Sequence, residues 1–316
     1  MNASVRFDSS ACHGALRLAH WGLIQAQGAD APSFLHGQLS QDMAHHPQDQ
    51  WRQAAFCSPK GRMLASFHSV RLSEDSYWLL VDAGVLPATL KRLSMFVMRA
   101  KCKLTDESAQ IAVVGLVGTP ASELAGAQPV GSVWASESGA ARYLRLSDVQ
   151  GVARVLVVGP VAEVQPWLDR GPSLPESTWN ALQVLSGEAR IELAGVDQFV
   201  PQMINFELIG GVNFQKGCYP GQEVVARSQY RGTLKRRLAL LASTQPMSSG
   251  QEVFSSADPG QPAGMVVNAA PLPGGDWVAL AELKLAAQAH SIHLGSAEGP
   301  VASLGALPYA IPEGDA

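Results

Sequence analysis

The sequence predicts an α+β protein of more than one domain that ends in a small β-barrel. The chain has 316 residues, of which 47% are hydrophobic and 16% charged, so it is long and apolar enough for two or three packed domains. Strand-like and helix-like segments alternate up to about residue 237. Beyond it, short strand-like runs are separated by turn clusters rich in glycine and proline, a pattern typical of a barrel.

The first part of the chain alternates predicted strands with two predicted helices. Asp30 followed by Pro32 is a typical helix start, and Pro87 opens a second helix. The turn Ser58–Gly61 joins two of the strands. The predicted strands cover residues 21–27, 53–57, 63–72 and 77–81.

The middle of the chain has a β-α-β-β-α pattern that predicts a separate ferredoxin-like α+β domain. A linker rich in glycine and proline follows at residues 169–178. The predicted elements are strands at 111–117, 143–146 and 152–158, and helices from 119 and at 161–168.

The last part is predicted to contain two helices and then the barrel strands. The helices cover 179–185 and 221–230, and the strands cover 238–242, 265–268 and 277–283. We therefore predict a domain of residues 1–105 completed by 176–237, a second domain of 106–175, and a barrel of 238–316.

Charge and cysteine usage narrow the function classes. The 23 Lys and Arg against 27 Asp and Glu give a net charge of −4, so direct binding to nucleic acid is not expected. No apolar run approaches the roughly 18 residues that span a bilayer, and no signal-peptide core stands at the N-terminus; we expect a cytoplasmic protein without stable membrane association. The four cysteines are scattered without a C-x-x-C pair, so free thiols and no metal site are expected.

The stretch KGCYPGQE, residues 216–223, stands out from this background. Gly217 and Gly221 bracket Cys218, and the loop precedes a predicted helix whose positive end favours a thiolate. Six cations against one anion follow within residues 216–237: Lys216, Arg227, Arg231, Lys235, Arg236 and Arg237 against Glu223. We predict that Cys218 is partly exposed with a lowered pKa; the alternative is a buried, inert thiol.

This stretch resembles the K-G-C-Y-x-G-Q-E signature of the YgfZ family of folate-binding proteins, which is related to the T-protein aminomethyltransferase of glycine cleavage. GADAPSFLHGQLSQDM, FCSPKGRML and LPYAI resemble other family segments. The resemblance implies a three-domain, T-protein-like ring around a central channel that accepts tetrahydrofolate. It also implies a role in maintaining iron–sulfur enzymes, including those that thiolate tRNA.

The resemblance further implies site residues. It gives Cys218 and Lys216 catalytic roles, and it gives cofactor-binding roles to Trp21, Trp179, Asn205, Tyr219 and Arg231. The indole rings suit a flat pterin, although either tryptophan could instead be a core anchor. The anionic folate tail would pair with Arg231, Lys235, Arg236 or Arg237, or these cations form a solvated surface.

Two departures from the aminomethyltransferases bear on activity. Ala65–Ser66 stands where the relatives carry an Asp pair, and Leu185 where they carry a pterin-binding glutamate; Glu188, Glu192 and Glu207 are candidate replacements. The first departure argues against aminomethyl transfer.

Three functions are therefore compared. The preferred one is a tetrahydrofolate-binding accessory protein that assembles or repairs iron–sulfur enzymes, contacting them through Cys218, since one thiolate cannot hold a cluster alone. The alternative is a tetrahydrofolate-dependent aminomethyl or one-carbon transferase. A third is a tRNA-contacting factor that uses residues 227–237, which the overall charge disfavours.

Overall fold

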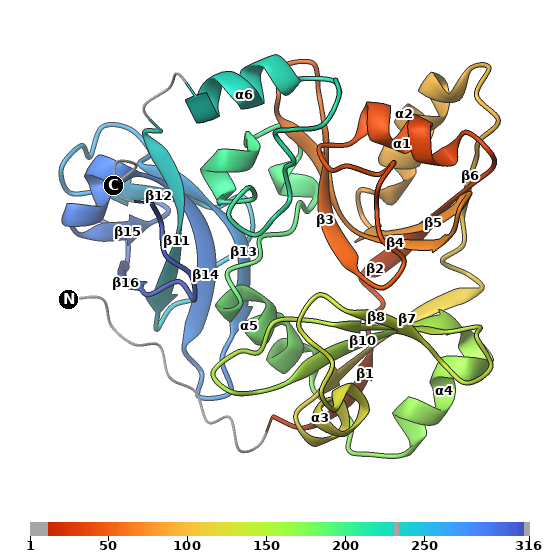
Figure 1. Ribbon diagram of the computed structural model, residues 1–316. Helices are drawn as coiled ribbons and strands as arrows, with labels where there is room; N and C mark the ends of the chain where they lie inside the picture. The colour runs from red at the N-terminus through yellow and green to blue at the C-terminus, as the bar shows by residue number, and fades with distance from the viewer. Residues whose placement is uncertain (1–11, 231–233, 313–316) are drawn as a thin grey trace.

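The computed structural model describes residues 12–230 and 234–312. Two five-stranded sheets and a closed six-stranded barrel are arranged around the centre of the molecule, where helix α5 (Glu176–Leu185) lies (Figure 1). Within the described residues, no helix combines the length and the hydropathy that a membrane span requires.

The first sheet has the strand order β3-β4-β5-β2-β6, and every neighbouring pair is antiparallel. Helices α1 (Ala31–Gln38) and α2 (Leu86–Val97) cover one face, where Phe34, Leu35 and Leu93 pack on alternate strand residues. The strands are β2 (Trp21–Gln27), β3 (Trp51–Cys57), β4 (Met63–Ser73), β5 (Ser76–Asp82) and β6 (Lys103–Asp106).

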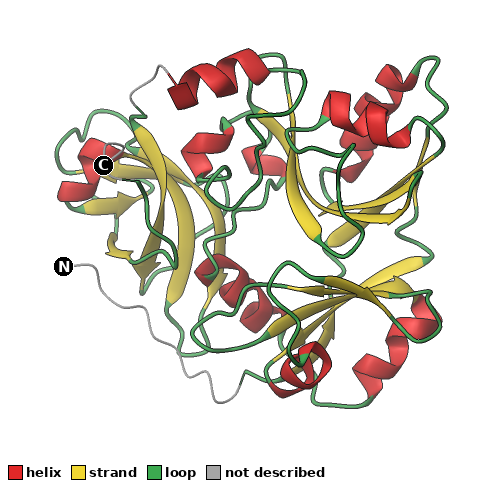
Figure 2. Ribbon diagram, viewed as in Figure 1, coloured by secondary structure: helices red, strands yellow, loops and turns green. Residues whose placement is uncertain are grey.

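The second sheet has the order β1-β7-β10-β9-β8, with helices α3 (Thr119–Ala125) and α4 (Val161–Asp169) on its outer face (Figure 2). Its edge strand β1 (Gly14–Arg17) precedes the whole first sheet in sequence and pairs with β7 (Ile111–Val117). The other strands are β8 (Val133–Ala135), β9 (Arg142–Arg145) and β10 (Arg154–Pro160).

The barrel closes in the order β11-β14-β13-β12-β15-β16. Small and branched side chains fill its interior, as expected for a barrel of this size. Its elements are β11 (Arg236–Ser243), β12 (Glu252–Ser255), β13 (Gly264–Pro271), β14 (Trp277–Lys284), η4 (Leu285–Ala289), β15 (Ile292–Leu294) and β16 (Val301–Gly305).

The segment before the barrel fills the space between these three bodies. It contains α5, the short helices η2 (Leu193–Gly195) and η3 (Pro201–Ile204), and α6 (Gln222–Tyr230). The largest hydrophobic cluster lies here, because Leu23 of the first sheet, Leu156 of the second, Leu240 of the barrel and Trp179 of α5 all belong to it. The predicted α+β class and C-terminal barrel are confirmed; the domain boundaries and the folate channel remain predictions.

Candidate functional site

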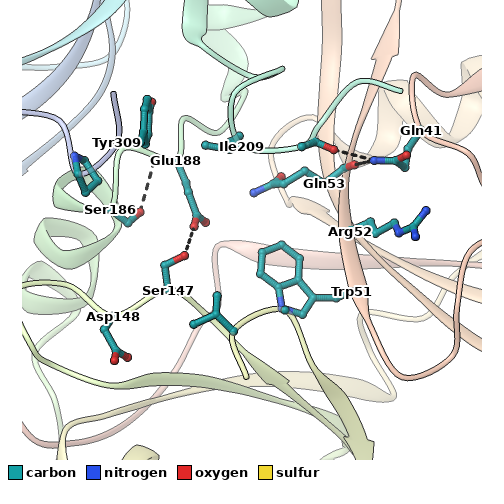
Figure 3. Close-up of a pocket in the computed structure, with 14 residues that line it drawn as sticks. Gln41, Trp51, Arg52, Gln53, Ser147, Asp148, Ser186, Glu188, Ile209 and Tyr309 are labelled. Carbon is teal, nitrogen blue, oxygen red and sulfur yellow. Dashed lines mark hydrogen bonds between the residues drawn. The ribbon is translucent and has the colours of Figure 1, made fainter. Parts of the chain in front are cut away.

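A cavity of about 540 Å³ opens where the three bodies meet (Figure 3). Figure 3 shows Glu188 and Ser147 on one side, Gln41 and Arg52 on the other, and Trp51 between them. The lining residues come from seven separate parts of the chain: Gln41, Trp51, Arg52, Gln53, Val130, Gly131, Ser147, Asp148, Ser186, Glu188, Ile209, Gly210, Pro308 and Tyr309.

Glu188 places a carboxylate in this cavity directly after the turn that ends α5. Gly187 has φ +72°, and a Cβ there would lie 2.7 Å from the ring of Tyr309, so the turn requires glycine. The Ser147 hydroxyl donates to Glu188 Oε1 at 3.1 Å, while buried Oε2 has no hydrogen-bond partner among the described residues. Burial raises the pKa of Glu188, and attraction to the fully buried Arg154 and the Ser147 hydrogen bond oppose that shift.

An aromatic wall stands beside the carboxylate. The ring centroids of Trp51 and His68 are 4.6 Å apart, and Trp21 stacks on His68 at 5.0 Å. Burial, with Arg154 and Arg190 nearby, lowers the pKa of His68 to about 3, so its ring is neutral. The Gln53 amide nitrogen donates to His68 Nε2 at 3.0 Å, which puts the ring proton on Nδ1.

Several buried polar atoms behind this wall lack a hydrogen-bond partner among the described residues. They are Trp21 Nε1, His68 Nδ1, Trp179 Nε1, Arg154 Nη2 and Glu188 Oε2. An unsatisfied buried polar atom costs about 1–3 kcal/mol. Four of these atoms are N–H donors and the fifth is a carboxylate oxygen, a combination that fits a polar ligand or ordered water in the interior.

The two tryptophans named from the resemblance lie behind the cavity and do not line it. Trp21 is buried against His68 and lies under the Arg190 guanidinium at 5.3 Å. Trp179 is fully buried, and the Arg154 guanidinium lies 6.0 Å from its ring. The indole that lines the cavity is Trp51, which the sequence did not distinguish from the other tryptophans.

Asn205 lies in the interior and joins two segments of the backbone. It is fully buried with φ +55°, and its side-chain amide bonds the backbone N–H and C=O of Leu238, joining η3 to the first barrel strand. Arg231 lies outside the described residues. Arg236 is paired with Glu282 at 2.7 Å, and Arg237 with Glu207 in the interior, whereas Lys235 is exposed.

Lys216 ties the cysteine loop to the end of helix α1. The Lys216 ammonium donates to the carbonyls of His36 and of Leu39, the latter at 2.9 Å, at the end of α1. It also lies 4.7 Å from the ring centroid of buried Tyr219. Burial lowers the pKa of Lys216 to about 8, partly offset by Asp42 and Cys218.

Cys218 itself is exposed, whereas Cys12 and Cys57 are buried and Cys102 is half-buried. The loop ends at Gly221, where φ is +80° and a Cβ would lie 2.4 Å from the Ser58 carbonyl oxygen. The turn Ser58–Gly61 and the cysteine loop therefore touch, which explains the glycine.

Neither the Asp-pair position nor the glutamate position of the aminomethyltransferases carries a cavity-lining carboxylate. Ala65 and Leu185 are buried, and the Ser66 hydroxyl accepts the Ile191 N–H at 3.0 Å. Glu192 instead bonds Arg190 and Asn268. Of the three candidate replacements, only Glu188 lines the cavity. No group of three or more His, Cys, Asp or Glu within residues 12–230 and 234–312 could hold a metal ion.

Comparison with known proteins agrees with this architecture. Residues 13–163 match the GCVT N-terminal domain. The structure is similar to glycine cleavage system aminomethyltransferase T from Bartonella henselae, with a TM-score of 0.77 and 18% identity over 95% of this chain and 87% of that one. This similarity confirms the T-protein-like fold.

Sequence identity to curated proteins identifies the family. The chain is 29% identical to the tRNA-modifying protein YgfZ of Sodalis glossinidius (strain morsitans), over 94% of this chain and 93% of that protein. It is 31% identical to the protein of the same name from Shigella dysenteriae serotype 1 (strain Sd197), over 72% of each chain. At this identity and coverage, the resemblance to YgfZ is confirmed, and the chain belongs to the YgfZ family.

Proposed function

We propose that the protein binds a tetrahydrofolate in the central cavity and serves tRNA modification as an accessory factor for iron–sulfur enzymes. The observation that carries the proposal is the buried carboxylate of Glu188, with one free oxygen, facing an aromatic wall in a chain of the YgfZ family. The fold shared with an aminomethyltransferase and the relatives' name as tRNA-modifying proteins support it.

The cavity's own residues suit a reduced pterin. A carboxylate can accept two N–H bonds from the 2-amino group and the ring nitrogen, and Glu188 Oε2 is available for one of them. Trp51 offers a flat apolar surface for the ring system. When bound, the folate would supply one-carbon or redox chemistry, while these residues bind and orient it.

Cys218 is the group through which the protein would act on a client enzyme. Its thiol is exposed on a loop that Lys216 ties to the end of α1, so a partner can reach it. A single thiolate fits transient contact with a partner's cluster better than a resident cluster.

The transferase alternative is less well supported by the geometry. Residues 65 and 66 offer a buried methyl group and a hydroxyl that is already bonded to Ile191 N–H, so neither can deprotonate a transferred amine. We therefore favour folate binding without aminomethyl transfer.

Anaerobic calorimetric titration with tetrahydrofolate tests the binding site. Glu188→Gln should weaken binding about 10- to 100-fold, because a hydrogen bond to a charged group contributes about 1.5–3 kcal/mol. Glu223→Gln, at a side chain 88% exposed on α6, is the matched control and should bind as the native protein does. Equal affinities of the native and Glu188→Gln proteins would rule out this carboxylate as the pterin anchor.

The thiol role needs a separate test. Cys218→Ala should retain folate binding but fail to restore tRNA thiolation in a strain that lacks its own YgfZ-family protein. Normal restoration by Cys218→Ala would exclude the thiol from the function and leave the folate site untouched.

A further inference from the structure

A second groove adjoins the central cavity and runs toward the cysteine loop. A groove of about 520 Å³ shares Gln41, Arg52 and Gly210 with the cavity. From there it continues along residues 212–215 to Tyr230, at the end of α6. Because three residues line both spaces, the groove adjoins the cavity, and a ligand that reached from one to the other would pass Arg52.

Arg52 stands at the junction with an uncompensated charge. Three of the residues that line the cavity are Asp, Glu or Arg, and each of the two acids has an arginine partner: Asp148 pairs with Arg145 at 2.6 Å, and Glu188 is attracted to the buried Arg154. Arg52 makes no ion pair with a carboxylate of residues 12–230 or 234–312. Figure 3 shows it beside Gln41, extending away from Glu188.

The groove beyond Arg52 suits an extended polar chain better than a flat ring. Asn213 and Gln215 contribute amide groups to it, and the rings of Phe214 and Tyr230 pack edge to face at 5.9 Å at its far end. An arginine fork binds a carboxylate through two parallel hydrogen bonds, which fixes both position and orientation.

We propose that Arg52 binds a carboxylate of the ligand's tail and that the groove receives the rest of that tail. The ligand class is then a tetrahydrofolate with a chain of γ-linked glutamates. This inference rests on the proposed folate site, since it requires the pterin to lie at Glu188. It replaces Arg236 and Arg237 as tail-binding candidates, because both are already paired with carboxylates.

Three probes separate the tail from the pterin: 6-methyltetrahydropterin, which has no tail, tetrahydrofolate, and tetrahydropteroyl-triglutamate. Affinities are measured by anaerobic calorimetry for the native protein, Arg52→Leu, Arg52→Lys and the control Arg92→Leu, at an exposed position of α2. Native protein should bind the triglutamate tightest. Arg52→Leu should bind both tailed ligands about 10- to 100-fold more weakly than native protein does, and it should bind the pterin with unchanged affinity. Arg52→Lys, which keeps the charge without the fork, should lie between, and Arg92→Leu should match native protein.

The outcomes are distinct. The native preference for tailed ligands should also shrink in high salt, because Arg52 is only half-buried. If native protein binds the pterin and both folates equally, or if Arg52→Leu weakens all three probes equally, the tail inference is overturned while the folate site stands. If native protein binds none of the probes, the proposed function fails and the inference fails with it.

Discussion

Replacing Trp179 by alanine should destabilise the protein strongly, because this ring is a core anchor at the centre of the molecule. Trp179 is 0% exposed and belongs to the cluster that joins all three bodies. A Cβ at Gly115 would lie 2.5 Å from the Trp179 ring, so the indole packs directly on the β7 backbone. Substitution of a fully buried tryptophan by alanine costs about 3–5 kcal/mol. At about 2 °C per kcal/mol for a chain of this size, the melting temperature should fall by about 6–10 °C.

The assay is thermal unfolding followed by near-ultraviolet circular dichroism, with Gly115→Ala and Trp51→Phe as companions. Gly115→Ala forces a methyl group against the Trp179 ring and should lower the free energy of unfolding by about 1–3 kcal/mol. Trp51→Phe keeps an aromatic ring at the cavity wall and should change the melting temperature less than either. A Trp179→Ala protein with native stability and abolished folate binding would refute this reasoning and restore Trp179 as a ligand contact.

Three further predictions follow from the same contacts. The folded protein binds a proton at His68 only near pH 3, whereas the unfolded chain binds it near pH 6.5, so stability should fall as the pH drops below 6.5. When the pH is lowered from 7 to 5, the free energy of unfolding measured with urea should fall by about 2 kcal/mol more in native protein than in His68→Gln. Equal decreases in the two proteins would contradict the neutral buried ring. Iodoacetamide on folded protein should label Cys218 before Cys57, whose pKa burial raises to about 12; early labelling of Cys57 by peptide mass spectrometry would disprove this. Lys216→Met should lower the free energy of unfolding by about 1–3 kcal/mol, because the carbonyls of His36 and Leu39 at the end of α1 lose their donor; an unchanged melting temperature in thermal unfolding would show that they are satisfied otherwise.

The sequence predicts the long, central elements well because their signals are local. The strand 21–27 and the helix that ends at Tyr230 have a continuous pattern of their own and match β2 and α6 closely. Strands β1 and β8 were not predicted, since each has only three or four residues, and β1 gains its stability from pairing with the distant strand β7. The short barrel strands β12, β15 and β16 were missed for the same reason.

The site was only partly predictable because packing, not sequence spacing, assembles it. The resemblance located the exposed Cys218, and Glu188 was one of three candidate carboxylates, but only the fold brings Glu188 to Trp51. Lys216 was expected to act on the thiol, and the structure adds a second task that no local pattern encodes, since its partners are carbonyls 177 and 180 residues away. Arg52 was not considered, because only the fold shows that no carboxylate of residues 12–230 or 234–312 pairs with it.

A crystal structure of the protein with tetrahydrofolate tests the central claim most directly. We predict a pteridine ring against Trp51, within hydrogen-bond distance of the Glu188 carboxylate, and a glutamate carboxylate at Arg52. Ligand bound elsewhere, or a cavity that stays without ligand at concentrations that saturate the protein in solution, would contradict it.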